Sequence, residues 1–209
     1  MELQYYVIDT ETTGIKPLYH EMTEIGIIRC KDRVQLCRNI KCEYPERANY
    51  DALRITNKTL EDLKNGLDKY QVVEDCNKFF EEDGATPAHR VIVAHNASFD
   101  KRFLHALWTS CDKQFPATMW LDTISLTRDF AKKQGIKKPK VNLHAACDLV
   151  GIKKIASAHS AKVDSRNTYF LYKNLVEDKK IDYLPFIKTE PHIVSSSYDE
   201  ADLSILEDI

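Results

Sequence analysis

The sequence predicts an α/β fold with a mixed β-sheet, in which antiparallel strands come first and parallel strands follow, flanked by helices. Three observations predict it. The strand-like segments 22–30 and 33–40 are separated only by a short polar turn, as in an antiparallel hairpin. The segment 90–95 (RVIVAH) is a continuous apolar run, typical of a strand buried on both faces. Apolar residues at helical spacing recur before and after that run.

The individual elements follow from local patterns along the chain. Residues 4–9 are expected to form the first strand, and residues 48–84 to be helical, with TLED resembling a capping box at Thr59. The segment SFDKRFLHALW is amphipathic and predicts a helix directly after the buried strand. The later elements are one short extended piece and three helices, expected at 119–121, 123–134, 142–150 and 160–178.

Length and charge limit the kinds of protein that this chain can be. Its 209 residues suit one domain with a sizeable core. Thirty basic residues against 32 acidic residues leave a net charge of -2, which excludes a protein that coats nucleic acid by charge alone. Any contact with nucleic acid is therefore expected at a local patch or through metal ions.

The sequence shows no targeting signal, and this together with the cysteine spacing predicts a cytoplasmic protein with reduced thiols. The sequence begins with a strand-like run rather than a basic leader, and its apolar runs are too short for a membrane helix. Six cysteines are present without any C-x-x-C pair, which favours reduced thiols over a structural zinc site. We therefore expect an intracellular protein that makes no membrane contact.

The composition changes after about residue 185. The last segment, KTEPHIVSSSYDEADLSILEDI, combines proline and serines with many acids and offers little to pack. We therefore expect a folded domain at 1–184 and a flexible acidic tail at 185–209.

Two acids at the end of the first strand are the first functional signal. Residues two apart in a strand project to the same side, so Asp9 and Glu11 are expected to lie together. Neighbouring carboxylates repel each other, and burial raises that cost. A divalent cation such as Mg²⁺ or Mn²⁺ removes the repulsion, because these ions prefer oxygen ligands. Gly14 then allows a sharp turn. Taken alone, such a pair more often caps a turn beside water.

Two later stretches strengthen the signal. VIVAHNASFD leads from the buried strand into a polar elbow, with Asn96 followed by Asp100 near the start of a helix. AHSAKVD places His159 five residues before Asp164. If a helix begins around Ser160, His159 lies in the preceding loop and Asp164 in the second turn, and both can face one pocket.

These residues carry a clear resemblance. DTETTG, AHNASFD and HSAKVD, in that order, resemble the three motifs of the DEDDh 3′–5′ exonucleases, relatives of the proofreading epsilon subunit of bacterial replicases. LDTISLTR and LHAACDLVGI resemble connecting segments of the same family. The resemblance extends over about residues 4–176 and implies a ribonuclease H-like fold.

The resemblance also implies an active site. Asp9, Glu11, Asp100 and Asp164 would hold two divalent cations, Mg²⁺ or Mn²⁺, with Asp9 between them and Asp100 supporting one. His159 would act as the general base, since its ordinary pKa near 6.5 lets it accept a proton at neutral pH. The implied activity is 3′–5′ exonucleolytic release of nucleoside 5′-monophosphates, most simply from DNA in proofreading or trimming. RNA processing by the same fold is the alternative.

Substrate contacts are implied for five further residues. They follow the second acid or flank Asp100: Thr12, Thr13, Ile15, Asn96 and Phe99. Turn formation by the threonines and core packing by Ile15 and Phe99 explain the same residues equally well. One segment departs from the family, because many relatives carry His-Gly-Ile-Thr where this chain has LRIT, with Leu53 and Arg54 in the first two positions. The departure puts substrate specificity in doubt, not catalysis.

Two segments suggest partners beyond the site. The loop 132–140 (KKQGIKKPK) carries five lysines, which fit either phosphate contacts or an ordinary solvated surface. In the tail, DLSIL at 202–206 resembles a degenerate sliding-clamp-binding peptide, through which a clamp or a DNA polymerase could be bound. An acidic tail with incidental apolar residues explains it as well.

Two other classes compete with the nuclease. DTETT faintly resembles the D-x-D-x-T motif of phosphatases with an aspartyl nucleophile, but there the second acid is Asp, and AHNASFD and HSAKVD have no place. A non-catalytic nucleic-acid-binding module of the same fold should have lost some of the metal-binding acids, whereas all four are present here together with His159.

Overall fold

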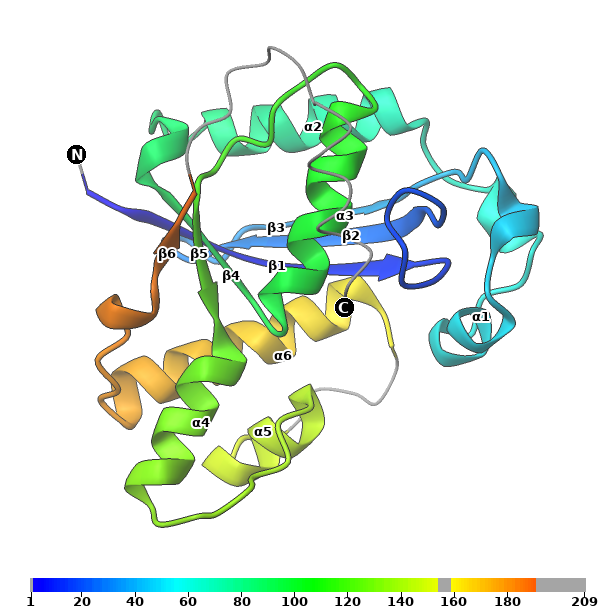
Figure 1. The fold of residues 1–209 in the computed structure, drawn as a ribbon. Helices are drawn as coiled ribbons and strands as arrows, with labels where there is room; N and C mark the ends of the chain where they lie inside the picture. Colours follow the sequence, from blue (N-terminus) through cyan, green and yellow to red (C-terminus); the bar gives the residue numbers. More distant parts are fainter. Residues whose placement is uncertain (1, 154–158, 191–209) are drawn as a thin grey trace.

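The computed structural model of the chain describes residues 2–153 and 159–190, and one six-stranded sheet organises them (Figure 1). The strand order is β3-β2-β1-β4-β5-β6. β1 pairs antiparallel with β2 and parallel with β4, so the predicted mixed sheet is confirmed. The predicted hairpin is β2 with β3. The strands are β1 Gln4–Thr12, β2 Met22–Arg29, β3 Gln35–Asn39, β4 Arg90–Ala94, β5 Met119–Asp122 and β6 Lys188–Thr189.

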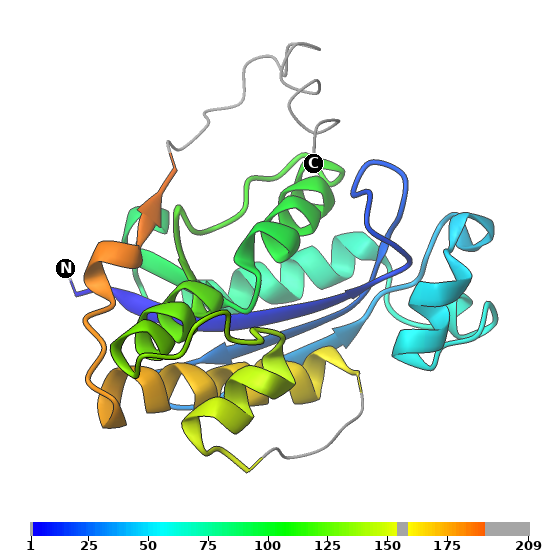
Figure 2. The ribbon, with the colours of Figure 1, turned by 60° about the horizontal axis from the view of Figure 1, so that its bottom comes forward.

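Helices cover both faces of the sheet (Figures 1 and 2). Side chains alternate along β1, so that Tyr6 and Ile8 pack into the core under α2 and α3, whereas Val7 packs into the core formed with α5 and α6. β1 is thus sandwiched between two apolar layers, and polar side chains on it are placed deep in the molecule. The helices are α1 Tyr50–Thr56, α2 Lys69–Glu81, α3 Ala97–Thr109, α4 Thr123–Lys133, α5 Leu143–Val150 and α6 Ala161–Lys173.

The sequence predicts that residues 48–84 are helical, but the structure divides this segment into α1 and α2. Asn57 adopts a left-handed conformation with φ 53° and ends α1. The capping-box bonds at Thr59 are present, since Thr59 and Asp62 each bond the backbone N–H of the other, but they begin only the single 3₁₀ turn Asp62–Lys64. Leu67 then pairs with Ile40 as an isolated bridge. Tertiary pairing therefore overrides the helical pattern.

The chain beyond residue 184 also differs from the expectation. β6 pairs antiparallel with β5 and extends the sheet. Glu190 follows it, donates its N–H to the carbonyl oxygen of Thr118 at 2.8 Å, and forms an ion pair with Lys101 on α3. Lys188 and Thr189 thus extend the sheet and Glu190 is held beside it, whereas the expectation placed the whole of 185–209 in a flexible tail. The remainder of the expected tail lies outside the described residues.

Two further features of the described residues concern the cysteines and the lengths of the helices. All six cysteines lie within them and none is in a disulfide. Among residues 2–153 and 159–190, no helix has the length and apolar character needed to cross a membrane.

Candidate active site

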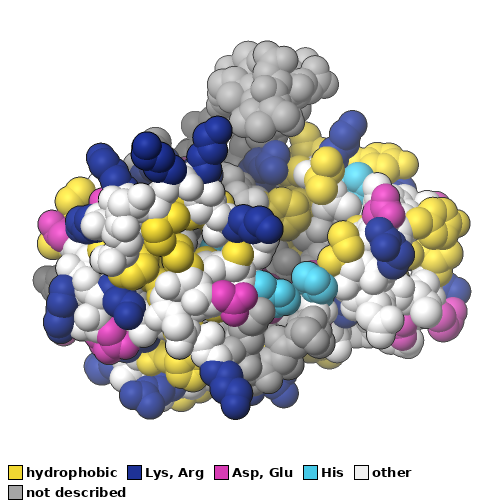
Figure 3. Space-filling view, turned by 90° about the horizontal axis from the view of Figure 1, so that it is seen from below, with side chains coloured by type: hydrophobic (Ala, Val, Ile, Leu, Met, Phe, Trp, Pro, Cys, Tyr) yellow, Lys and Arg dark blue, Asp and Glu magenta, His cyan; other side chains and the backbone are white. Residues whose placement is uncertain are grey.

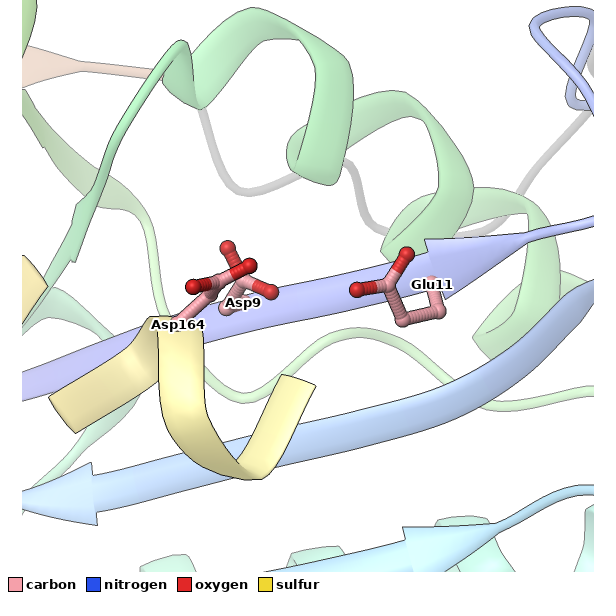
Figure 4. Close-up of side chains that lie close together, drawn as sticks. All are labelled: Asp9, Glu11 and Asp164. Carbon is pink, nitrogen blue, oxygen red and sulfur yellow. The ribbon is translucent and has the colours of Figure 1, made fainter. Parts of the chain in front are cut away.

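Three carboxylates converge where β1 passes α6 (Figure 4). β1 continues to Thr12, so Asp9 and Glu11 lie within the strand and project from the same side. Asp164 reaches them from α6, where it occupies the first turn rather than the second. One ligand atom from each of the three carboxylates lies within 4.8 Å of the other two. The predicted convergence of the first and third motifs is therefore present.

Gly26 lets α6 approach the sheet closely enough for this convergence. It lies on β2 directly opposite Asp9. A Cβ added at Gly26 would lie 2.3 Å from the carbonyl oxygen of Ala161, the first residue of α6. Only glycine fits between β2 and the backbone of α6 here, three residues before Asp164. No local sequence motif marks this glycine, because its partner lies far away in the sequence.

Asp100 joins the site from α3. Its side chain is buried, and its Oδ1 accepts a hydrogen bond of 2.8 Å from the Thr10 hydroxyl. Thr10 lies between Asp9 and Glu11 and points to the opposite face of β1, so it fixes the first turn of α3 against the strand. The Asp100 carboxylate is the strongest charged influence on Asp9.

Burial and mutual repulsion keep these carboxylates from ionising easily. Burial raises the pKa of Asp9 well above its usual value, and the charges of Asp100 and Glu11 add to the effect. The pKa of Glu11 is raised to about 8, first by burial and then by Asp164. Burial raises the pKa of Asp100 to about 7, and burial also raises the pKa of Asp164. A site of oxygen donors with this much crowded negative charge suits divalent cations.

Glu24 is a further acid beside the site, is buried, and belongs to none of the three sequence motifs. It pairs directly with Glu11 across β1 and β2. Its Oε1 accepts hydrogen bonds from the Ser160 hydroxyl at 3.0 Å and from the Lys162 N–H at 3.2 Å, while Oε2 pairs with Lys58 at 3.4 Å. Glu24 therefore caps α6, whose own N-cap Ser160 makes no side-chain cap bond. A glutamate inside the apolar strand TEIGII was the signal that could have revealed it.

His159 lies at the surface beside these acids. Its Nδ1 is 3.9 Å from Oδ2 of Asp164, and half of its side chain is exposed. The ring stacks on His144 of α5 with a centroid distance of 6.0 Å. Figure 3 shows histidine side chains side by side on this face, with an acidic side chain next to them. A polar cleft of about 370 Å³ opens beside His159 and extends past Glu24 and Lys58.

The family follows from a comparison with known proteins. The sequence profile of the RNase T family, described as "Exonuclease", matches residues 6–172. This chain is a member of the RNase T exonuclease family. The match covers most of the chain and includes all three acidic motifs, so the predicted family and enzyme class are confirmed, and an aspartyl-nucleophile phosphatase is not supported.

Relatives of this exonuclease occur in bacterial replication proteins. The DNA polymerase III subunit epsilon of Treponema pallidum is 28% identical over 173 residues, which cover 82% of this chain and 76% of that protein. The PolC-type DNA polymerase III of Mycoplasmopsis pulmonis is 26% identical over 129 residues, which cover 61% of this chain and 8% of that protein. The exonuclease thus spans only a small part of the PolC-type relatives.

Solved structures of exonucleases share the predicted fold class. Escherichia coli exonuclease I in complex with a dT13 oligonucleotide superposes with a TM-score of 0.71 at 16% identity, over 86% of this chain and 42% of that chain. A 3′-exonuclease that recognises the histone mRNA stem-loop superposes with a TM-score of 0.66 at 13% identity, over 84% and 82%. At these low sequence identities, the similarity is evidence for a shared fold alone.

The residues after Glu11 form a tight turn in this exonuclease. Thr12 and Thr13 are buried; the Thr12 hydroxyl donates to the carbonyl oxygen of Gly14 at 2.6 Å, and the Thr13 hydroxyl accepts the Glu21 N–H. Gly14 is required for space, not for an unusual φ angle, because an added Cβ would lie 2.3 Å from the His20 ring. These contacts support the turn-forming interpretation of the threonines.

The other predicted substrate residues, Ile15, Asn96 and Phe99, differ in their exposure to solvent. Ile15 is 71% exposed. Asn96 is exposed in a left-handed conformation, and its N–H donates to Asp122 at 3.1 Å. Phe99 is half-buried against Phe103, with a centroid distance of 5.0 Å. Ile15 and Asn96 are therefore accessible to a ligand, while Phe99 serves partly in packing.

The two positions that depart from the family pattern lie on α1. Leu53 is buried with Cys42 and Leu63, whereas Arg54 is exposed and pairs with Asp51 at 3.3 Å. Leu53 therefore has a packing role.

The lysine-rich loop is exposed and tethered to the second motif. Its five lysines are all at the surface. Next to the loop, the partly buried ring of His95 bonds Thr123 through Nδ1 and the carbonyl oxygen of Val141 through Nε2. Val141, the residue after the loop, is therefore joined to His95, which directly precedes Asn96.

Proposed function

We propose that this exonuclease hydrolyses nucleic acids from the 3′ end and releases nucleoside 5′-monophosphates, with DNA as its substrate. The observation that carries the proposal is the convergence of Asp9, Glu11 and Asp164 from two distant motifs, with Asp100 coupled to them through Thr10. Family membership supports the reaction class. The match to the epsilon subunit covers 76% of that protein, and this relative supports DNA as the substrate and a role in proofreading or trimming.

The four carboxylates fit a pair of divalent cations, and we propose Mg²⁺ or Mn²⁺. Asp9, Glu11, Asp100 and Asp164 would hold the ions, because all four offer oxygen ligands and all four have a raised pKa in the metal-free protein. When bound, the ions neutralise the acids and stabilise the negative charge of the phosphate during in-line displacement.

His159 is proposed to be the general base. Its Nδ1 faces Asp164, an orientation that favours a proton on Nδ1 and leaves Nε2 to accept a proton from the attacking water. The water oxygen forms a bond to phosphorus while the bond from phosphorus to the 3′ oxygen breaks. The leaving oxygen takes a proton from solvent, and His159 returns its proton to bulk water. Exposure of the His159 ring permits this exchange.

One assay tests the reaction and its metal dependence. A 3′-labelled oligonucleotide should release labelled mononucleotide with Mg²⁺ and none with a chelator. Asp9→Ala should abolish release, and His159→Ala should lower the rate by about 10²–10⁴, as for other general bases. The exposed acid Asp51 provides the matched control Asp51→Ala, which should keep full activity. Near-normal turnover by Asp9→Ala would refute the site.

RNA is the second candidate substrate, because the histone mRNA 3′-exonuclease shares the fold over most of both chains. Matched DNA and RNA oligonucleotides, assayed side by side, decide between them. Faster RNA cleavage would replace DNA as the substrate without changing the mechanism.

We also propose that residues 202–206 (DLSIL) bind a sliding clamp or a polymerase-associated partner. These residues lie outside the described part of the chain, and the resemblance of the peptide to clamp-binding motifs is the support. Titration of the isolated peptide against a bacterial sliding clamp tests the idea, and no detectable binding would remove it.

A further inference from the structure

A groove between the loop after β1 and α3 is lined by exposed aromatic side chains and an arginine. It has a volume of about 160 Å³, and its lining includes Tyr19, Tyr44 and Arg47 above Phe103 and Leu107 of α3. In Figures 1 and 2 the loop after β1 stands between α3 and the segment around α1. On the side that carries α1, at the right in Figure 3, hydrophobic side chains are exposed beside basic ones.

Arg47 forms a stack with the two tyrosines. Its guanidinium carbon lies 4.0 Å from the centroid of the Tyr44 ring and 5.4 Å from that of Tyr19. Both rings remain open to solvent, since Tyr19 is 52% and Tyr44 is 44% exposed. An arginine held close to aromatic rings can stack on a base or bind a phosphate.

The two acids that line the groove, Glu21 and Glu43, are engaged by other groups. The two carboxylate oxygens of Glu21 accept the backbone N–H groups of Glu43 and Tyr44 at 2.7 and 2.8 Å. The side chain of Glu43 pairs with Lys69 at 3.1 Å. The positive charge of Arg47 is therefore available to an anionic ligand.

The stack is also rigidly connected to the catalytic strand. Asn49 donates its N–H to the carbonyl oxygen of Thr13 at 2.7 Å, and Thr13 donates its own N–H to the carbonyl oxygen of Glu21 at 2.8 Å. Thr13 lies two residues after Glu11. Both loops that carry the tyrosines are thus fixed to the end of β1, which presents the acids.

We propose that Tyr19, Tyr44 and Arg47 form a stacking platform for the bases of single-stranded nucleic acid on the 5′ side of the terminal nucleotide. This inference rests on the proposed exonuclease function and assigns that site a preference for an unpaired strand. Bases of any sequence offer a flat face to aromatic rings, and the arginine adds a phosphate contact. Continuity with the catalytic strand favours the substrate over a protein partner as the occupant.

Two substrates of different length test the platform in the full chain. One is an oligonucleotide of about 12 deoxythymidines, and the other is the p-nitrophenyl ester of thymidine 5′-monophosphate, which has a single phosphodiester. Tyr44→Ala or Tyr19→Ala should raise KM for the oligonucleotide about tenfold, the range expected for loss of one stacked base. The value of kcat/KM for the ester should stay within about twofold. Tyr44→Phe should retain wild-type KM, because it keeps the ring.

Arg47→Gln should also raise KM for the oligonucleotide, and should reduce the slope of log affinity against log salt by about 0.7. Tyr70→Ala and Arg33→Gln, at exposed positions outside the groove, are the matched controls and should change neither substrate. Equal losses on both substrates, or no loss on the oligonucleotide, would overturn the platform. If these substitutions left KM for the oligonucleotide unchanged but abolished binding of this chain to a partner protein, the groove would be a protein-docking surface and the platform would be overturned.

Failure of the proposed function would be visible separately, since the wild-type chain would then cleave neither substrate. Fluorescence anisotropy with a labelled deoxythymidine oligonucleotide and a chelator would still measure the platform. Weaker binding by Tyr44→Ala and Arg47→Gln would support it, and unchanged binding would overturn it.

Discussion

The crowded carboxylates of Asp9, Glu11, Asp100 and Asp164 define this exonuclease at the scale of the residue. In the metal-free protein the raised pKa values mean that the folded state holds protons that the unfolded chain releases. Protons and divalent cations therefore compete for the same oxygen atoms. Stability and metal binding should depend on pH in a linked way.

We predict that the metal-free protein loses stability as the pH rises from about 5 to about 8.5. The pKa of Glu11 is about 8 when folded against an ordinary 4.5, so folded Glu11 keeps its proton where the unfolded residue has lost it, and that stabilisation disappears as the pH passes the folded pKa. Asp100, with a pKa of about 7, acts in the same direction. Melting temperatures in a chelating buffer measure the effect.

The matching prediction concerns added metal. Mg²⁺ should raise the melting temperature more at pH 8 than at pH 6, because fewer protons then compete with it. Glu11→Gln should flatten the pH dependence, whereas Glu46→Gln, at an exposed position, should leave it unchanged. A metal-free protein equally stable at both pH values would contradict the raised pKa values.

At the scale of the element, the position of α6 decides whether the acids meet. α6 presents Asp164, follows His159, and is held by two contacts: the close approach at Gly26 and the capping carboxylate of Glu24. Each contact can be broken by one substitution.

Gly26→Ala should displace α6. The new Cβ would lie 2.3 Å from the carbonyl oxygen of Ala161, and because that atom belongs to the backbone, the helix must move. We expect a loss of about 1–3 kcal/mol in the free energy of unfolding, typical of overpacking, and a larger relative loss of activity because Asp164 moves too. Gly84→Ala is the control for activity: nothing lies within 4 Å of its Cβ position, and its φ of +66° costs alanine some stability, but the active site should not change. Wild-type activity of Gly26→Ala would contradict the role of this contact.

Glu24→Ala should uncap α6. Removal of the acceptor for Ser160 and Lys162 should cost about 1 kcal/mol of unfolding free energy, the usual value of a helix cap, and should lower kcat. Glu24→Gln retains an acceptor oxygen and should keep most of the stability. Urea unfolding followed by circular dichroism distinguishes the two variants, and equal losses would assign the effect to the ion pair with Lys58.

At the scale of the whole molecule, the sequence predicts most of the fold because its strongest signals are local. The hairpin, the buried strand β4 and the acidic motifs are each readable within about ten residues. The division of 48–84 was not predicted, since Leu67 pairs with Ile40 on another part of the chain. Glu24 and Gly26 were missed for the same reason: their roles depend on α6, more than 130 residues away.

The lysine-rich loop is expected to extend the substrate contacts beyond the active site. It is exposed and follows α4, which starts beside the second motif. Replacement of its lysines by glutamine should weaken oligonucleotide binding and reduce the salt slope by about 0.7 for each lysine that contacts a phosphate. The tested lysines are Lys137, Lys138 and Lys140. Glutamine at Lys31, Lys78 and Lys113, exposed on other surfaces, controls for net charge, and an unchanged slope would mean that the loop is only solvated.

The anchoring of Glu190 to Lys101 gives the exonuclease a defined exit point for the rest of its chain. Lys101 directly follows Asp100, so whatever continues beyond Glu190 departs from the helix that serves the active site. A molecule bound by residues after Glu190, as proposed for 202–206, would be held near a bound 3′ terminus, where its effective concentration would exceed its concentration in solution. Handover of a trimmed end to another enzyme would then be an intramolecular event.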